Sequence, residues 1–92
     1  MKKKVRMTAL FRGRVQGVGF RYTASEVAAA FPVAGTVENL PDGSVRLCAE
    51  GTRDACEALL EAVRARMDRF VTSVDATWGE PTGKEGGFRI LS

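Results

Sequence analysis

The spacing of apolar side chains along the chain predicts two helices. From residue 20 onward, apolar positions recur every three or four residues, as on one face of a helix: Phe20, Ala24, Val27, Ala28 and Phe31. Pro32 should end this helix, because proline restricts the residue before it and lacks an amide hydrogen. A second helix should follow Thr52, a good N-cap, with this apolar stripe: Ala55, Leu59, Ala62 and Val63.

Shorter segments have the character of β-strands. Residues 44–50 alternate between apolar and other side chains, with Val45, Leu47 and Ala49 on one side. Residues 33–40 alternate more loosely, and the Leu40-Pro41-Asp42-Gly43 stretch after them is a strong turn signal. These two segments should form a hairpin. Further strands are expected at 5–12, 71–78 and 88–91, with a loop from 79 to 87.

The predicted order is βαββαβ with a short extra C-terminal strand. This is an α+β, ferredoxin-like arrangement, in which two helices cover one face of an antiparallel sheet. The 92 residues suit a single domain, residues 1–92, and the hydrophobic share of 45% with a charged share of 27% is that of an ordinary globular protein.

Composition excludes several kinds of chemistry. The chain has no histidine, which removes imidazole acid–base catalysis and the histidine-activated nucleophiles. Two cysteines, Cys48 and Cys56, are too few for a disulfide framework or a zinc site. No metal or cofactor is therefore expected. Without a signal peptide or a long apolar run, a cytoplasmic monomer that binds neither membrane nor nucleic acid is the expectation.

The stretch GRVQGVGFR, Gly13 to Arg21, is the candidate site. It places three glycines between a strand and a helix. The first amides of a helix lack partners inside the helix and carry partial positive charge, so a glycine-rich turn there can bind phosphate or carboxylate. Arg21 would be a cation at that end, which a bound anion would stabilise. The alternative is a simple connection with a surface arginine.

Asn39 is the second candidate. In a split βαβ unit the first two strands are parallel, so their carboxyl ends lie at one end of the sheet, about 10 Å apart. Asn39 ends its strand with the same parity as Val37 and should project toward the helices. It could therefore meet Arg21, or alternatively cap the hairpin turn.

These stretches, with GTVENLPDGSV and AEG after them, resemble the acylphosphatases over nearly the whole chain. That family comprises small ferredoxin-like enzymes that hydrolyse the carboxyl–phosphate bond of acyl phosphates without a metal. The resemblance implies a phosphate-binding loop, a catalytic Arg21 and a water-orienting Asn39. The loop consists of Gln16, Gly17, Val18, Gly19, Phe20 and Arg21. The chain departs from the family pattern at Pro32, where a glycine is usual, and at Thr36, where an aromatic residue would form part of a cleft wall.

The resemblance also implies the ligands: a small acyl phosphate as substrate, and phosphate or sulfate as a product-like ligand. Three other functions are alternatives for a domain of this architecture. An RNA-binding domain of this architecture would carry stacking aromatics on its central strands, and residues 44–50 have none. A non-catalytic anion-sensing or partner-binding module would not need both Arg21 and Asn39. The acylphosphatase-like domain of hydrogenase-maturation carbamoyltransferases continues into cysteine-rich zinc segments.

Overall fold

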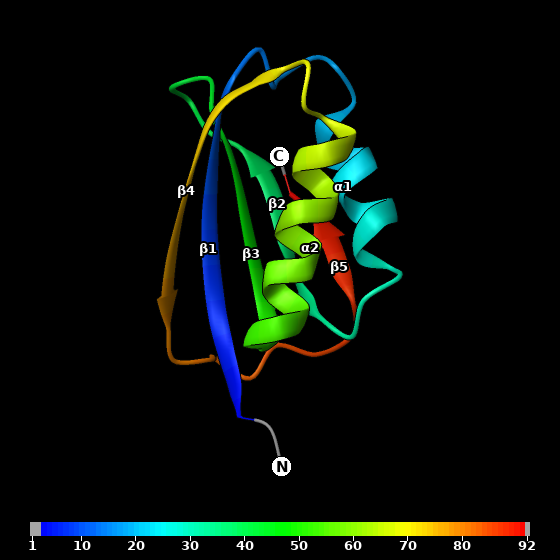
Figure 1. The fold of residues 1–92 in the computed structure, drawn as a ribbon, viewed down its shortest axis with the longest axis vertical. Helices are drawn as coiled ribbons and strands as arrows, with labels where there is room; N and C mark the ends of the chain where they lie inside the picture. Colours follow the sequence, from blue (N-terminus) through cyan, green and yellow to red (C-terminus); the bar gives the residue numbers. More distant parts are fainter. Residues whose placement is uncertain (1–2, 92) are drawn as a thin grey trace.

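The strands form one sheet whose order is β4-β1-β3-β2-β5, and both helices lie on one of its faces (Figure 1). The computed structural model describes residues 3–91. Its elements in chain order are β1 (Lys4–Gly13), α1 (Phe20–Ala28), β2 (Ala34–Asn39), β3 (Val45–Thr52), α2 (Arg53–Arg66), β4 (Val71–Gly79) and β5 (Phe88–Ile90). This order confirms the predicted ferredoxin-like fold. No helix in the described range is long and apolar enough to cross a membrane.

The sheet is mixed rather than wholly antiparallel. β1 pairs antiparallel with β3 and β4, and β2 pairs antiparallel with β3, but β5 pairs parallel with β2. The reason lies in residues 80–87, which cross from one edge of the sheet to the other at the same end (Figure 1). A strand that re-enters from that end must run opposite to β4 and therefore alongside β2.

The first helix is shorter than its apolar stripe predicts. α1 ends at Ala28, and the amides of Ala30 and Phe31 then donate to the carbonyls of Val27 and Ala28 at 3.1 and 3.0 Å. These bonds span three residues, so the chain tightens from an α-helix into a narrower turn. Pro32 explains the change, because it disfavours helical geometry at the residue before it. Phe31 still packs against the core.

One aromatic contact fixes where α1 begins. Phe20, the first residue of the helix, is 2% exposed, and its ring lies 4.9 Å from that of Phe11 on β1, at an angle of 58°. Thr52 caps α2 as predicted, accepting a hydrogen bond from the Ala55 amide at 3.2 Å. The residues that the sequence pattern placed at the two helix starts, Phe20 and Thr52, thus make the contacts that hold those starts.

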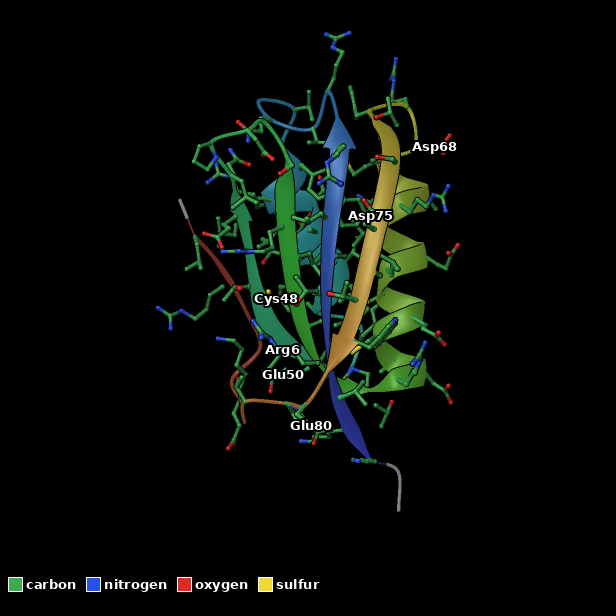
Figure 2. The ribbon with its side chains drawn as sticks, turned by 90° about the vertical axis from the view of Figure 1, so that its left-hand side faces the viewer. Arg6, Cys48, Glu50, Asp68, Asp75 and Glu80 are labelled. Carbon is green, nitrogen blue, oxygen red and sulfur yellow. The ribbon has the colours of Figure 1, made fainter. Side chains whose placement is uncertain are left out.

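A buried carboxylate holds the connection between β4 and β5. Glu50 on β3 is 4% exposed and lies at the lower end of the sheet in Figure 2. Its Oε1 accepts the amides of Thr82, Gly83 and Lys84 at 2.9, 2.9 and 3.1 Å, and its Oε2 accepts the Thr82 hydroxyl. Burial raises the pKa of Glu50, but these hydrogen bonds outweigh burial and lower the pKa to about 2.

A substitution at Gly35 tests whether the close approach of β2 to β3 requires a residue without a side chain. A Cβ at this position would lie 1.8 Å from the Cys48 carbonyl oxygen. The Gly35→Ala variant should therefore lose about 3 kcal/mol or more of unfolding free energy, because backbone atoms must move apart. Urea denaturation measures the loss. Gly79→Ala is the matched control, since its Cβ meets nothing within 4 Å and should change stability by less than about 0.5 kcal/mol.

Glu50→Gln tests the anchored connection. At neutral pH the variant should lose about 1–3 kcal/mol of unfolding free energy, because one amide group cannot accept all the hydrogen bonds of a carboxylate. The folded pKa of about 2 lies below the ordinary 4.5, so this stabilisation is fully present above about pH 4.5 and is lost as the pH falls toward 2. Denaturation at a series of pH values should show wild type and variant converging over that range. A difference that stays constant down to about pH 2 would contradict the assignment.

Candidate active site

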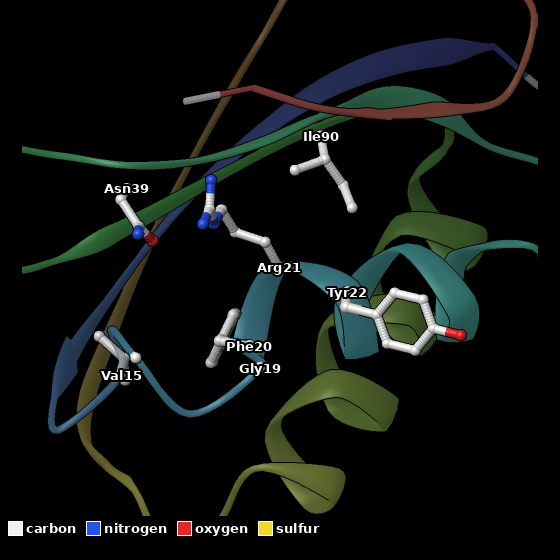
Figure 3. Close-up of a pocket in the computed structure, with 8 residues that line it drawn as sticks. Val15, Gly19, Phe20, Arg21, Tyr22, Asn39 and Ile90 are labelled. Atoms are coloured by element: carbon white, nitrogen blue, oxygen red, sulfur yellow. The ribbon is translucent and has the colours of Figure 1, made fainter.

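A cleft of about 210 Å³ opens at the end of the sheet where β1 leads into α1 (Figure 3). Its walls come from three parts of the chain: the loop after β1 with the start of α1, the end of β2, and β5. The lining residues are Val15, Gly17, Gly19, Phe20, Arg21, Tyr22, Asn39 and Ile90. The fold therefore brings the two predicted candidates, Arg21 and Asn39, to one hollow on the surface.

The loop between β1 and α1 presents a row of free amide groups. Gly17 and Gly19 have φ angles of 76° and 77°, in the left-handed region that glycine adopts without steric cost. Among residues 3–91, no backbone amide from Gln16 to Arg21 donates to another group. The positive end of the α1 dipole lies at the same place. Such a set of amides is a nest suited to an anion.

The guanidinium of Arg21 extends across the cleft toward Asn39 (Figure 3). Its Nη1 donates to the Leu91 carbonyl at 2.9 Å, which fixes one side of the group. The first turn of α1 contains no acidic residue, and Arg21 forms no ion pair with a described residue. A cation at the positive end of a helix dipole is electrostatically unfavourable by itself. An anion bound between the two would make the arrangement favourable.

Asn39 ends β2, where it pairs with Val45 of β3. Its carboxamide has no hydrogen-bond partner among the described residues and points toward the guanidinium (Figure 3). The hairpin turn is closed instead by Asp42, whose carboxylate accepts the amide and hydroxyl of Ser44 at 2.9 and 2.6 Å. These hydrogen bonds lower the pKa of Asp42. Asn39 is thus not the capping residue of the turn.

Comparison with known proteins identifies the family. The acylphosphatase family model matches residues 7–90. An acylphosphatase of Saccharopolyspora erythraea is 44% identical over 87 residues, which is 94% of this chain and 92% of that protein. An acylphosphatase of Salinibacter ruber is 47% identical, over 92% of this chain and 90% of that protein.

The chain belongs to the acylphosphatase family.

Structural comparison agrees with the sequence comparison. The crystal structure of the Bacillus subtilis acylphosphatase superimposes with a TM-score of 0.84 and 32% identity, covering 96% of this chain and 99% of that one. Family membership and this shared fold assign acyl phosphate hydrolysis to the chain. The cleft described above is therefore the candidate active site of an acylphosphatase.

Two residues of the expected loop do not line the acylphosphatase cleft. Gln16 turns its side chain to the hairpin, where Nε2 donates to the carbonyls of Leu40 and Ser44 at 2.8 and 2.9 Å. Val18 packs against the core. Their contribution to a ligand would come through their backbone amides alone. Thr36, expected near a cleft wall, lies off the cleft, because alternation along β2 turns it to the sheet face opposite Val37.

Three lining residues were not among the predicted site residues: Val15, Tyr22 and Ile90. Tyr22 follows Arg21 on α1, and Ile90 lies on β5 (Figure 3). A signal was present for Tyr22, since an aromatic residue on the polar side of an amphipathic helix has no core to face. Ile90 gave no such signal, because its place depends on the parallel pairing of β5 with β2.

Gln16 tests whether the loop depends on its attachment to the hairpin. Gln16→Ala removes two hydrogen bonds and should lower the unfolding free energy by about 1–2 kcal/mol. Gln16→Glu, almost the same shape, should lower it further, because a carboxylate would face two carbonyl oxygens. Urea denaturation at neutral pH compares the three proteins. A Glu variant as stable as wild type would contradict this role.

Proposed function

We propose that the chain hydrolyses acyl phosphates by in-line attack of water on phosphorus, without a metal ion or other cofactor. One observation carries the proposal: free backbone amides, an arginine without an ion-pair partner and a carboxamide without a hydrogen-bond partner share one cleft. One ligand, a phosphoryl group with an adjacent water, would provide hydrogen-bond or charge partners for all of these groups at once.

The amides of residues 16–21 and the guanidinium of Arg21 bind the phosphoryl oxygens. In phosphoryl transfer the charge to be stabilised lies on the equatorial oxygens, and catalysis consists largely of positioning and electrostatic stabilisation. Arg21 suits this task because its planar donors match two oxygens at once. Its bond to the Leu91 carbonyl holds it in place before the substrate arrives.

Asn39 positions the attacking water. Its carboxamide offers both a donor and an acceptor, so it can donate one hydrogen bond to the water and accept another from it, which leaves the second lone pair of the water directed at phosphorus. The carboxylate that leaves is a weak base and needs little protonation. Acid catalysis by histidine, which the chain lacks, is therefore unnecessary.

Arg21 and the loop amides take the part that Mg²⁺ plays in many phosphoryl-transfer enzymes. Among residues 3–91, no three His, Cys, Asp or Glu side chains are grouped as metal ligands. Residues from the loop after β1, α1, β2 and β5 of a single chain form the cleft, so the proposed site needs no residue from a second copy, and we propose a monomeric enzyme. Cys48 and Cys56 are buried free thiols, and we place the enzyme in the reducing cytoplasm, where thiols remain unpaired.

Arg21 and Asn39 should separate binding from chemistry. Arg21→Ala should lose phosphate binding and acetyl phosphate hydrolysis together, because the guanidinium contacts the oxygens of both. Asn39→Ala should bind phosphate nearly as wild type does, while its kcat falls about 100- to 1,000-fold. Isothermal titration with inorganic phosphate and steady-state kinetics measure the two effects.

Arg64→Ala is the matched control, since it removes an exposed arginine on α2, away from the cleft. It should leave both phosphate binding and kcat unchanged. Wild-type activity should also survive EDTA. A chain that binds phosphate but does not hydrolyse acetyl phosphate would instead be an anion-sensing module, and an activity lost on chelation would rule out the metal-free mechanism.

A further inference from the structure

Two large hydrophobic side chains remain exposed in the described range, and both line the cleft. Tyr22 is 63% exposed and Ile90 is 46% exposed. Scattered exposed apolar residues are ordinary and need no explanation. Here, however, two elements far apart in the sequence, α1 and β5, each place one beside a charged site. Neither side chain has a part in binding phosphoryl oxygens or in orienting water.

The in-line geometry of the reaction indicates which part of the substrate Tyr22 and Ile90 face. In an in-line displacement the attacking water and the leaving group lie on opposite sides of phosphorus. Figure 3 shows Asn39 on one side of the Arg21 side chain, and Tyr22 and Ile90 on the other. With water held at Asn39 and the phosphoryl group at the guanidinium, the leaving acyl group therefore points toward Tyr22 and Ile90.

Sheet and core contacts fix the backbone position of both residues. Ile90 pairs with Val37 of β2, and the next amide, that of Leu91, donates to the Val37 carbonyl at 2.8 Å. Tyr22 lies in the first turn of α1, whose start is fixed by the buried ring of Phe20. A tyrosine ring offers a broad apolar face with a polar tip, and loses little conformational freedom when a ligand packs on it. The two side chains, called the apolar wall below, thus lie on the same side of Arg21 and have fixed backbone positions (Figure 3).

We propose that Tyr22 and Ile90 form the subsite for the acyl group, and that the enzyme prefers acyl phosphates whose acyl group is apolar. This inference rests on the function proposed above. The phosphoryl group is the same in every acyl phosphate, so the phosphoryl site cannot distinguish among them. Preference must come from contacts with the acyl group. The apolar surface on its side of the cleft favours acyl groups with a large apolar surface, aromatic or aliphatic, over the small acetyl group.

The test compares kcat/KM for benzoyl phosphate and acetyl phosphate. Wild type should favour benzoyl phosphate. In Tyr22→Ala and in Ile90→Ala the ratio of the two values should fall about five- to tenfold, because apolar surface that the benzoyl ring covers is gone. Tyr22→Phe should keep the ratio, since the ring remains. Glu26→Ala, an exposed change further along α1 and outside the cleft, serves as the control and should also keep it.

Inhibition by inorganic phosphate distinguishes an acyl subsite from damage to Arg21. Phosphate has no acyl group, so its inhibition constant should stay within about twofold of wild type in both alanine variants. A ratio that falls while phosphate inhibition is retained supports the subsite. An unchanged ratio overturns it, and so does a loss of phosphate inhibition in both variants, which would place the two residues in the phosphoryl site. A wild type that hydrolyses neither substrate would overturn the proposed function and this inference with it.

Discussion

The packing of Phe20 on Phe11 is the contact on which the site depends. It buries the first side chain of α1 against β1 and so fixes the position and direction of the helix start. The loop before Phe20 then has to turn within a few residues, which it does with two glycines in the left-handed region. The residue after Phe20 is thereby directed into the cleft. A core contact thus places both the free amides and the guanidinium of Arg21.

Strand pairing supplies the second half of the site. β3 lies between β1 and β2 and pairs with both, so the ends of β1 and β2 open at the same end of the sheet. Gln16 joins the loop to the hairpin, and Leu91 joins Arg21 to the end of β5. The anchor at Glu50 belongs to the same framework, because it holds the connection that delivers β5 to its edge. The cleft is therefore built on strands and a helix rather than on a free loop.

The site keeps its charge unsatisfied until a ligand binds. Arg21 lies at the positive end of a helix dipole with no acid in that turn, and the loop amides have no partner among the described residues. Water screens these groups in the free protein, so the cost in stability is small. Arrangements of this kind favour catalysis, because the donors are already in place when charge develops in the transition state. The apolar wall beside them gives the rest of the substrate a surface to contact.

Local patterns were sufficient for the elements, the hairpin and the cap at Thr52. They also singled out Arg21 and Asn39, which the structure places in one cleft, while the catalytic roles of these two residues stay a prediction. These patterns depend on side-chain periodicity, on turn chemistry and on a motif, which are short-range properties of the chain. The parallel β5, the buried hydrogen bonds of Glu50 and the orientation of Gln16 depended on the folded chain. Each is a contact between segments distant in sequence. For Glu50 and Gln16, the side chain that makes the contact has the same local sequence pattern as one that faces water. Ile90 belongs with them, because it reaches the cleft only when β5 pairs with β2 at that edge of the sheet.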